Sequence, residues 1–156
     1  MSVNKYLPHV FVLPEDDDNR QLANGFHLQV AQVLQVAGGW NNVLKVFKEE
    51  HVTTMDRFPA GFMVLLIDFD RKQDRLNHAK AAIPDHLADR VFVLGAWSEP
   101  EYLKADLGAY ETIGSTLAAD CREETELAWR HVLLQHNTGE LDRLRVHVRP
   151  ILFPSV

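Results

Sequence analysis

Two groups of carboxylate side chains follow apolar runs in this chain. Residues 62–67 lead into Asp68-Phe69-Asp70, and the apolar residues 9–13 lead, after one proline, into Glu15-Asp16-Asp17-Asp18. Hard divalent cations such as magnesium prefer oxygen ligands, and their sites often combine one or two carboxylates with waters and phosphate oxygens. Crowded carboxylates repel one another and raise the pKa of at least one, unless a cation or a basic residue compensates. The two groups therefore predict an acidic, cation-binding pocket.

The strands that precede these groups determine where the carboxylates lie. Six consecutive apolar residues at 62–67 are typical of a strand buried on both faces in the middle of a parallel sheet. In open α/β sheets, the groups just beyond the carboxyl ends of the strands are those that meet ligands. Residues 9–13 predict a first strand, so Glu15 is expected opposite Asp68 across one crevice. Magnesium, with manganese as the alternative, is the ion that such a crevice suits.

The order of strands and helices predicts the fold class. Strands are expected at residues 9–13, 30–37, 62–67 and 90–95, and helices from residue 17 or 18, from 41 or 42 towards 55, and at 71–83. Such βαβ units require right-handed crossovers and place helices on both faces of a parallel sheet. We predict an α/β, Rossmann-like core at residues 1–98, with a mostly parallel sheet of four to five strands.

Residues 99–156 predict a mostly helical extension that packs on this core within a single structural domain. Helices are expected at residues 100–104, 111–122 and 124–134, and a short one opens at 138. Residues 146–153, bounded by prolines, predict one more edge strand.

Length and composition narrow the class of protein. A chain of 156 residues that is 46% hydrophobic can bury one proper core without disulfides. With a formal net charge of −6, the chain lacks the strongly basic character of proteins that bind nucleic acids unaided. Cys121 is the single cysteine, and no apolar run approaches the length that spans a bilayer. We expect a cytoplasmic protein with no membrane partner, and its oligomeric state stays open.

Each candidate residue also has a purely structural interpretation. Asp68 and Asp70 would then only end a strand and cap the next helix, with nearby basic residues neutralising them. Asp16 and Asp18 would be helix-start residues, held by backbone N–H groups and the helix dipole. Glu99 follows the fourth predicted strand, so it is expected at the same edge of the sheet as Asp68 and is a further candidate ligand.

The order of these parts resembles the toprim family, the topoisomerase and primase domain that also occurs in overcoming-lysogenization-type nucleases. The resemblance rests on Glu15 after the first strand, Gly38-Gly39 after the second and Asp68-Phe69-Asp70 after the third. It implies that Glu15 is a general acid or base in strand cleavage or joining, and that Asp68 and Asp70 coordinate magnesium. Asp18 matches a further acidic position, whereas Asp16 stands where that family has glycine. The implied partner is a nucleic acid or another phosphate-containing ligand.

A second resemblance is to two-component receiver domains. It implies that Glu15 and Asp16 bind magnesium and that Asp68 accepts a phosphoryl group. Gly95-Ala96 stands where that family has Ser or Thr, and its Lys-Pro pair after a fifth strand is missing. The alternative function is therefore a non-catalytic, receiver-like signalling or protein-interaction module. A third hypothesis is an accessory protein whose acidic cluster is a partner-binding surface.

Overall fold

A four-stranded, entirely parallel sheet forms the centre of the protein in the computed structural model, which describes residues 9–25, 31–98, 100–123, 125 and 128–148. The strands are β1 (His9–Pro14), β2 (Ala31–Val33), β3 (Gly61–Leu66) and β4 (Val91–Leu94), and they lie side by side in the order β2-β1-β3-β4. The predicted α/β class and the parallel sheet are confirmed.

Helices connect and follow the strands. The first half contains α1 (Asp17–Asn24), α2 (Trp40–Val46), the π-helical turn η1 (Phe47–His51), α3 (Val52–Arg57) and α4 (Gln73–Ala81). The second half contains the 3₁₀ turn η2 (Asp85–Arg90), α5 (Pro100–Leu107), α6 (Tyr110–Glu123), the 3₁₀ turn η3 (Gln135–Asn137) and α7 (Thr138–His147). Among the described residues, no helix combines the length and the apolar character that crossing a membrane requires.

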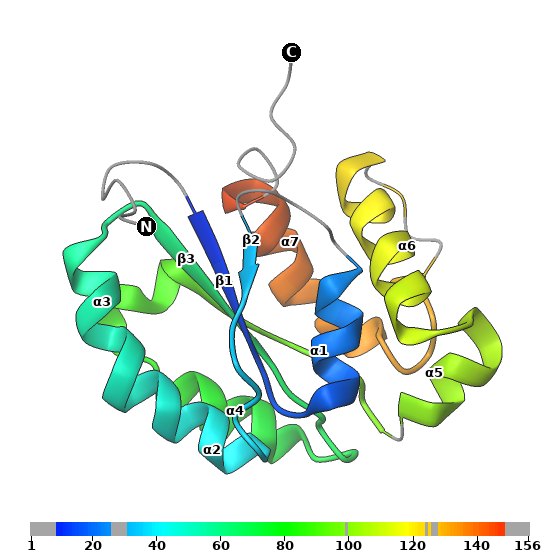
Figure 1. Cartoon of the computed structure of the whole chain (residues 1–156), viewed down its shortest axis with the longest axis horizontal. Coiled ribbons are helices and arrows are strands. Elements are labelled where there is room, and N and C mark those ends of the chain that lie inside the picture. The colour runs from blue at the N-terminus through cyan, green and yellow to red at the C-terminus, as the bar shows by residue number, and fades with distance from the viewer. Residues whose placement is uncertain (1–8, 26–30, 99, 124, 126–127, 149–156) are drawn as a thin grey trace.

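The sheet separates two hydrophobic cores, because side chains alternate between its faces. On β3, Val64 and Leu66 are buried with side chains of α1, α5, α6 and α7, whereas Met63 and Leu65 are buried with those of α2, α3 and α4. Figure 1 shows these two helical layers on either side of the strands. The predicted arrangement of helices on both faces is confirmed, and it explains why residues 62–67 are apolar without interruption.

The chain reverses its direction of travel across the sheet between β1 and β3. From β1 it crosses to β2 on one side and then returns to β3 on the other side. The loops that follow β1 and β3 therefore diverge to opposite faces and leave a crevice between them, which is where ligands bind in doubly wound sheets. The two carboxylate groups of the sequence follow these two strands.

Glycine contacts hold α1 against α6. A Cβ atom built on Gly114 would lie 1.9 Å from the carbonyl oxygen of Leu22, and one on Gly25 would lie 2.3 Å from that of Glu111. The Ser115 hydroxyl donates a hydrogen bond of 3.0 Å to the Gly25 carbonyl. Because no side chain separates the two backbones, α6 fixes the position of α1 and thereby of the acidic residues at its start.

Three predicted elements have different bounds. The second strand is shorter than predicted, since β2 ends at Val33, although the Leu34 N–H still donates to the Val12 carbonyl at 2.8 Å. The first helix ends at Asn24, and the predicted positions 26–30 lie outside the described residues. The second helix begins at Trp40 rather than at an asparagine cap, because Gly39 occupies the position before it.

The predicted helix at residues 124–134 is wrong. Its described residues form successive turns, and a buried carboxylate accounts for the change of direction. Asp120, which is 1% exposed, accepts hydrogen bonds from the Ala128 N–H at 2.7 Å and from the Thr125 hydroxyl at 2.6 Å. The Trp129 indole N–H also donates to the Leu117 carbonyl at 3.3 Å. These bonds fold the chain back onto the end of α6. The helical spacing of the apolar residues does not predict this change of direction.

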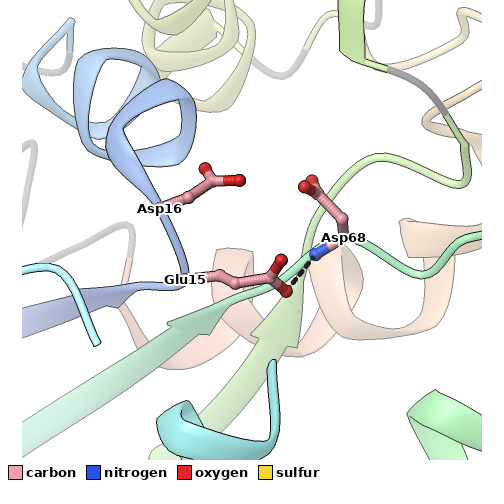
Figure 2. A group of neighbouring side chains, drawn as sticks. All are labelled: Glu15, Asp16 and Asp68. Carbon is pink, nitrogen blue, oxygen red and sulfur yellow. Dashed lines mark hydrogen bonds between the residues drawn. The ribbon is translucent and has the colours of Figure 1, made fainter. Parts of the chain in front are cut away.

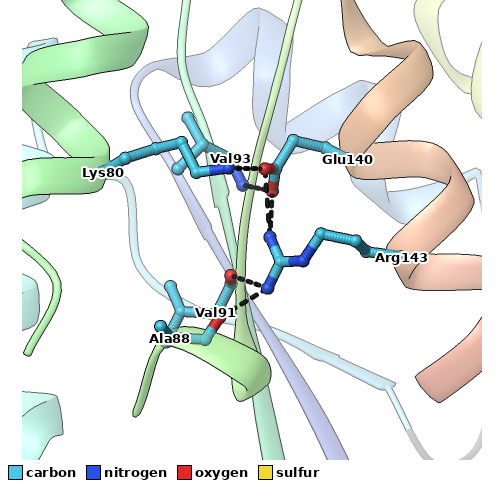
Figure 3. A network of polar contacts seen from close by, with 6 residues as sticks. All are labelled: Lys80, Ala88, Val91, Val93, Glu140 and Arg143. Atoms are coloured by element: carbon cyan, nitrogen blue, oxygen red, sulfur yellow. Dashed lines mark hydrogen bonds and ion pairs between the residues drawn. The ribbon is translucent and has the colours of Figure 1, made fainter. Parts of the chain in front are cut away.

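Polar side chains of η3 and α7 bond to the outer edge of β4, so this edge is not left open. Glu140, which is 5% exposed, accepts from the Val93 N–H at 3.0 Å and pairs with Lys80 of α4 and Arg143 (Figure 3). Arg143 donates to the carbonyl of Ala88, and the Asn137 amide exchanges bonds of 3.2 and 3.0 Å with the backbone of Gly95.

This arrangement overturns part of the predicted edge strand at residues 146–153. Val146 lies in α7, and Val148 is the residue at the end of that helix. Side chains of η3 and α7 bond to the edge of β4 that a further strand would have used. Residues 149–153 of the prediction lie outside the described part of the chain.

Candidate metal centre between β1 and β3

Three carboxylates converge where β1 and β3 end. Glu15, Asp16 and Asp68 each place one carboxylate oxygen within 4.8 Å of the others, and all three side chains are partly buried. Figure 2 shows Asp16, at the start of α1, and Asp68, after β3, facing one another, with Glu15 reaching below them. Oxygen atoms at this spacing can share one hard cation.

Backbone bonds fix Glu15 in this group. Its N–H donates to the Leu66 carbonyl at 2.9 Å, which extends the β1–β3 pairing by one residue. Its carboxylate atom Oε1 then accepts from the Asp68 N–H at 3.0 Å. The N–H groups of Gly38 and Gly39 donate to the Glu15 carbonyl at 2.9 and 3.2 Å. The glycine turn therefore holds Glu15 itself, and its two positive φ values, 85° and 118°, explain why glycine is needed there.

Asp16 and Asn19 connect α1 to the group. The Asp16 carboxylate caps α1 by accepting from the Asn19 N–H at 3.0 Å. Asn19 is 5% exposed. Its side-chain amide donates to the same Asp16 oxygen at 3.0 Å and to Asp68 Oδ1 at 3.4 Å. Asp16 thus fills the structural role that the sequence predicted, and it also belongs to the carboxylate group. Asn19 was missed, although its position three residues after a cap was a usable signal.

The electrostatics of the group favour a bound cation or proton. Burial first, and then the negative charges of Asp16 and Glu15, raise the pKa of Asp68 from 3.8 to about 7. The pKa of Glu15 is also raised, chiefly by burial and in part by Asp16, while the Asp68 N–H and Arg75 counteract this. A nearby positive charge favours the ionised carboxylate, so a divalent ion would counteract the burial and repulsion that raise these pKa values.

Asp70 lies apart from the group. The chain leaves the extended conformation there, with φ of 50° at Asp70 and 59° at Arg71. The Asp70 side chain is 64% exposed and lies 3.6 Å from Arg75 and 3.9 Å from Lys72. Because of this turn, Asp68 and Asp70 do not share a face as they would in a continuing strand.

Asp18 also stands outside the group of three. Asp18 is half-buried in α1, and its pKa is raised by burial and by the charges of Asp16 and Glu101, with Lys104 counteracting them. Its carboxylate therefore borders the acidic region without being one of the three converging residues. Glu99 lies outside the described residues.

Arg75 supports the loop after β3 and packs on Trp40, two contacts that sequence reasoning missed. Arg75 of α4 donates from Nη1 to the backbone carbonyl of Asp68 at 2.7 Å. Its guanidinium carbon lies 5.0 Å from the centre of the Trp40 ring. The sequence shows Arg75 only as one of several basic residues, so the signal that singles it out is the geometry alone. It is the cation among the described residues that partly lowers the pKa of Glu15.

Comparison with protein-family models, with curated proteins and with solved structures found no match for this chain. The geometry of the site therefore carries the functional argument alone.

Proposed function

We propose that this protein binds a divalent cation, magnesium or manganese, through Asp16 and Asp68, with Glu15 beside them as a general acid or base, and that it acts with this ion on a phosphodiester bond. The observation that carries the proposal is the convergence of three partly buried carboxylates at the crevice between β1 and β3. Burial and the charges of Asp16 and Glu15 raise the pKa of Asp68 to about 7, and strongly perturbed carboxylates in a crevice are typical of functional sites.

The three residues fit the ion by their chemistry. Hard cations take oxygen ligands and retain waters, and three carboxylates leave coordination positions for waters and phosphate oxygens. When bound, the ion neutralises charge on a transferring phosphoryl group and lowers the pKa of a bound water. Within this chain, Asp16 and Asp68 would hold the ion. Glu15, with its raised pKa, is suited to exchange a proton with the reacting oxygen.

This assignment keeps the predicted roles of Glu15 and Asp68 and changes the second ligand from Asp70 to Asp16. The toprim resemblance remains a hypothesis about ancestry. Its Asp-x-Asp pair would require Asp70 to turn back from Lys72 and Arg75 on binding the ion, and the variants below distinguish the two ligand sets.

Thermal melting in magnesium tests the binding step. A ligand that binds only the folded state stabilises it by RT ln(1 + [L]/Kd), about 1.4 kcal/mol at ten times Kd, which is roughly 3–6 °C for a chain of this size. We expect this rise for the wild type and its loss in Asp16→Asn and Asp68→Asn. Asp70→Asn is the matched control and should retain it. An equal rise in melting temperature in all four proteins would refute the site. A loss of the rise in Asp70→Asn would instead support the set that the sequence predicted, which includes Asp70.

Cleavage of labelled DNA and RNA strands tests the chemical step. We expect magnesium-dependent products from the wild type, which disappear in Glu15→Gln and in Asp68→Asn. Glu15→Gln should still show the melting shift, because Glu15 is assigned to proton exchange and the ion is held by Asp16 and Asp68. Activity that survives in both variants would contradict the proposed reaction.

Phosphoryl acceptance by Asp68 is the second candidate function, because Glu15 and Asp16 stand beside it as ion ligands would in a receiver. In that reaction the Asp68 carboxylate attacks the phosphorus of a donor such as acetyl phosphate, and acetate leaves. Intact-mass measurement after incubation with acetyl phosphate and magnesium should then show one added phosphoryl group, absent from Asp68→Asn. An unchanged mass would exclude this function.

A further inference from the structure

A second polar feature lies beside the candidate metal centre, in a groove between α2, η1 and α4. The groove has a volume of about 290 Å³. Leu44 and Ala82 are its apolar lining residues, and Asn41, Lys45, Lys48, Glu49 and His78 are its polar ones. Its volume is just below the usual range for small-molecule sites, so it suits one small group of a ligand.

The charges of the groove favour an anion. Lys45 and Lys48 are exposed, and neither forms an ion pair within the part of the chain that the structure describes. Glu49 is the single acidic residue in the lining, against two lysines. In a protein of net charge −6, two lysines against one glutamate give the groove lining a local positive charge.

The backbone of the helix is also unusual at this place. The helix that begins at Trp40 continues through the π-helical turn η1 before it resumes as α3. Lys48 and Glu49 lie in this turn and line the groove. A π turn inserts an extra residue into the helical ladder, and such turns are frequent at functional sites.

Trp40 links the groove to the candidate metal centre. The His78 ring, which lines the groove, meets the Trp40 ring edge-to-face at a centroid distance of 5.5 Å. Arg75 lies 5.0 Å from the centre of the same ring, and it also holds the backbone of Asp68. The contacts His78–Trp40, Trp40–Arg75 and Arg75–Asp68 therefore connect the groove to the loop that carries Asp68.

We propose that the groove lined by Asn41, Lys45, Lys48 and His78 binds a phosphate group of the ligand whose reacting phosphodiester lies at the carboxylates. The inference rests on the proposed function for the identity of that ligand. The lysines supply charge, and Asn41 and His78 supply N–H donors. The ligand is a nucleic-acid strand or a free nucleotide, which share this chemistry.

Salt-dependent binding of a fluorescently labelled single-stranded oligonucleotide tests the groove. The measurement is made in EDTA, so that metal-dependent cleavage cannot occur. Each phosphate contact contributes about 0.7 to the slope of log Kobs against log salt for single strands. We expect Lys45→Gln/Lys48→Gln to weaken binding and to reduce the slope by about 1.4. Arg57→Gln/Arg130→Gln, two exposed cations on other elements, removes the same charge and should keep the wild-type slope.

The outcomes separate the groove from the metal centre. An unchanged slope in the lysine variant, an equal reduction in the control variant, or no binding by the wild type would overturn the groove. A reduced slope together with no magnesium melting shift in the wild type would overturn the proposed function and leave a phosphate site. Competition by a mononucleotide at equal phosphate concentration would assign the groove to free nucleotides, and failure to compete would assign it to strands.

Discussion

Replacing Asp68 by Asn should change how the stability of the protein depends on pH. The raised pKa means that the folded chain holds a proton on Asp68 that the unfolded chain has lost above about pH 4. The contribution of Asp68 to the free energy of unfolding is fully present below pH 3.8 and is lost as the pH rises to about 7. The difference between these two pKa values corresponds to a change of about 4 kcal/mol in the free energy of unfolding. Because solvent reaches part of the Asp68 side chain, we expect ~2 kcal/mol.

Denaturant unfolding in EDTA, at pH values from 4 to 8, measures this effect. Asp68→Asn is neutral at every pH, so its free energy of unfolding should exceed the wild-type value by an amount that grows between pH 4 and 7 and then stays constant. Asp142→Asn removes an exposed carboxylate of α7 and should follow the wild type. A difference between Asp68→Asn and the wild type that is the same at pH 4 and pH 8 would refute the electrostatic reasoning.

Two further changes test what positions the site. Gly114→Ala places a methyl group against the Leu22 carbonyl and should lower the free energy of unfolding, measured with denaturant, by about 1–3 kcal/mol. Gly139→Ala is the control, because Gly139 has open space around it, and it should be neutral or stabilising. Equal effects of the two substitutions would contradict the close packing of α1 on α6. Glu140→Ala leaves Arg143 and the Val93 N–H without their shared acceptor and should lower the free energy of unfolding by about 3 kcal/mol. Glu140→Gln should lower it less. A decrease below about 0.5 kcal/mol in Glu140→Ala would show that this network contributes little to stability.

The fold was predictable because its signals are local and periodic. The uninterrupted apolar run at residues 62–67 indicates a strand covered on both faces, and β3 is such a strand. The spacing of Ile113, Leu117 and Cys121 likewise indicated a helix, and all three are buried in α6. Patterns of this kind depend on which side of an element meets the core, and the sequence carries that information directly.

The errors arose where side chains, rather than periodicity, direct the backbone. Asp120 accepts hydrogen bonds from Thr125, Ala128 and Trp129 and so turns the chain, although Trp129 and Leu133 are spaced as on one face of a helix. Glu140 and Asn137 bond to the edge of β4, so the chain near Val146 continues as a helix. In both cases the partners are distant or irregular in sequence, and no local propensity encodes them.

The same distinction explains why Glu15 and Asp68 were predicted as neighbours across the crevice, whereas Asp16 was expected as a ligand only by the receiver resemblance. Glu15 and Asp68 follow directly from the ends of β1 and β3, which are hydrogen-bonded neighbours, so any parallel pairing of these strands brings them together. The third position depends on the first residue of each outgoing loop. After β1 the chain enters α1 at once, and the cap holds Asp16 towards the crevice. After β3 the two positive φ values turn Asp70 outwards to Lys72 and Arg75. An Asp-x-Asp pattern therefore places both carboxylates on one face only while the strand continues, and here Asp16, which caps α1, lies in the converging group whereas Asp70 does not.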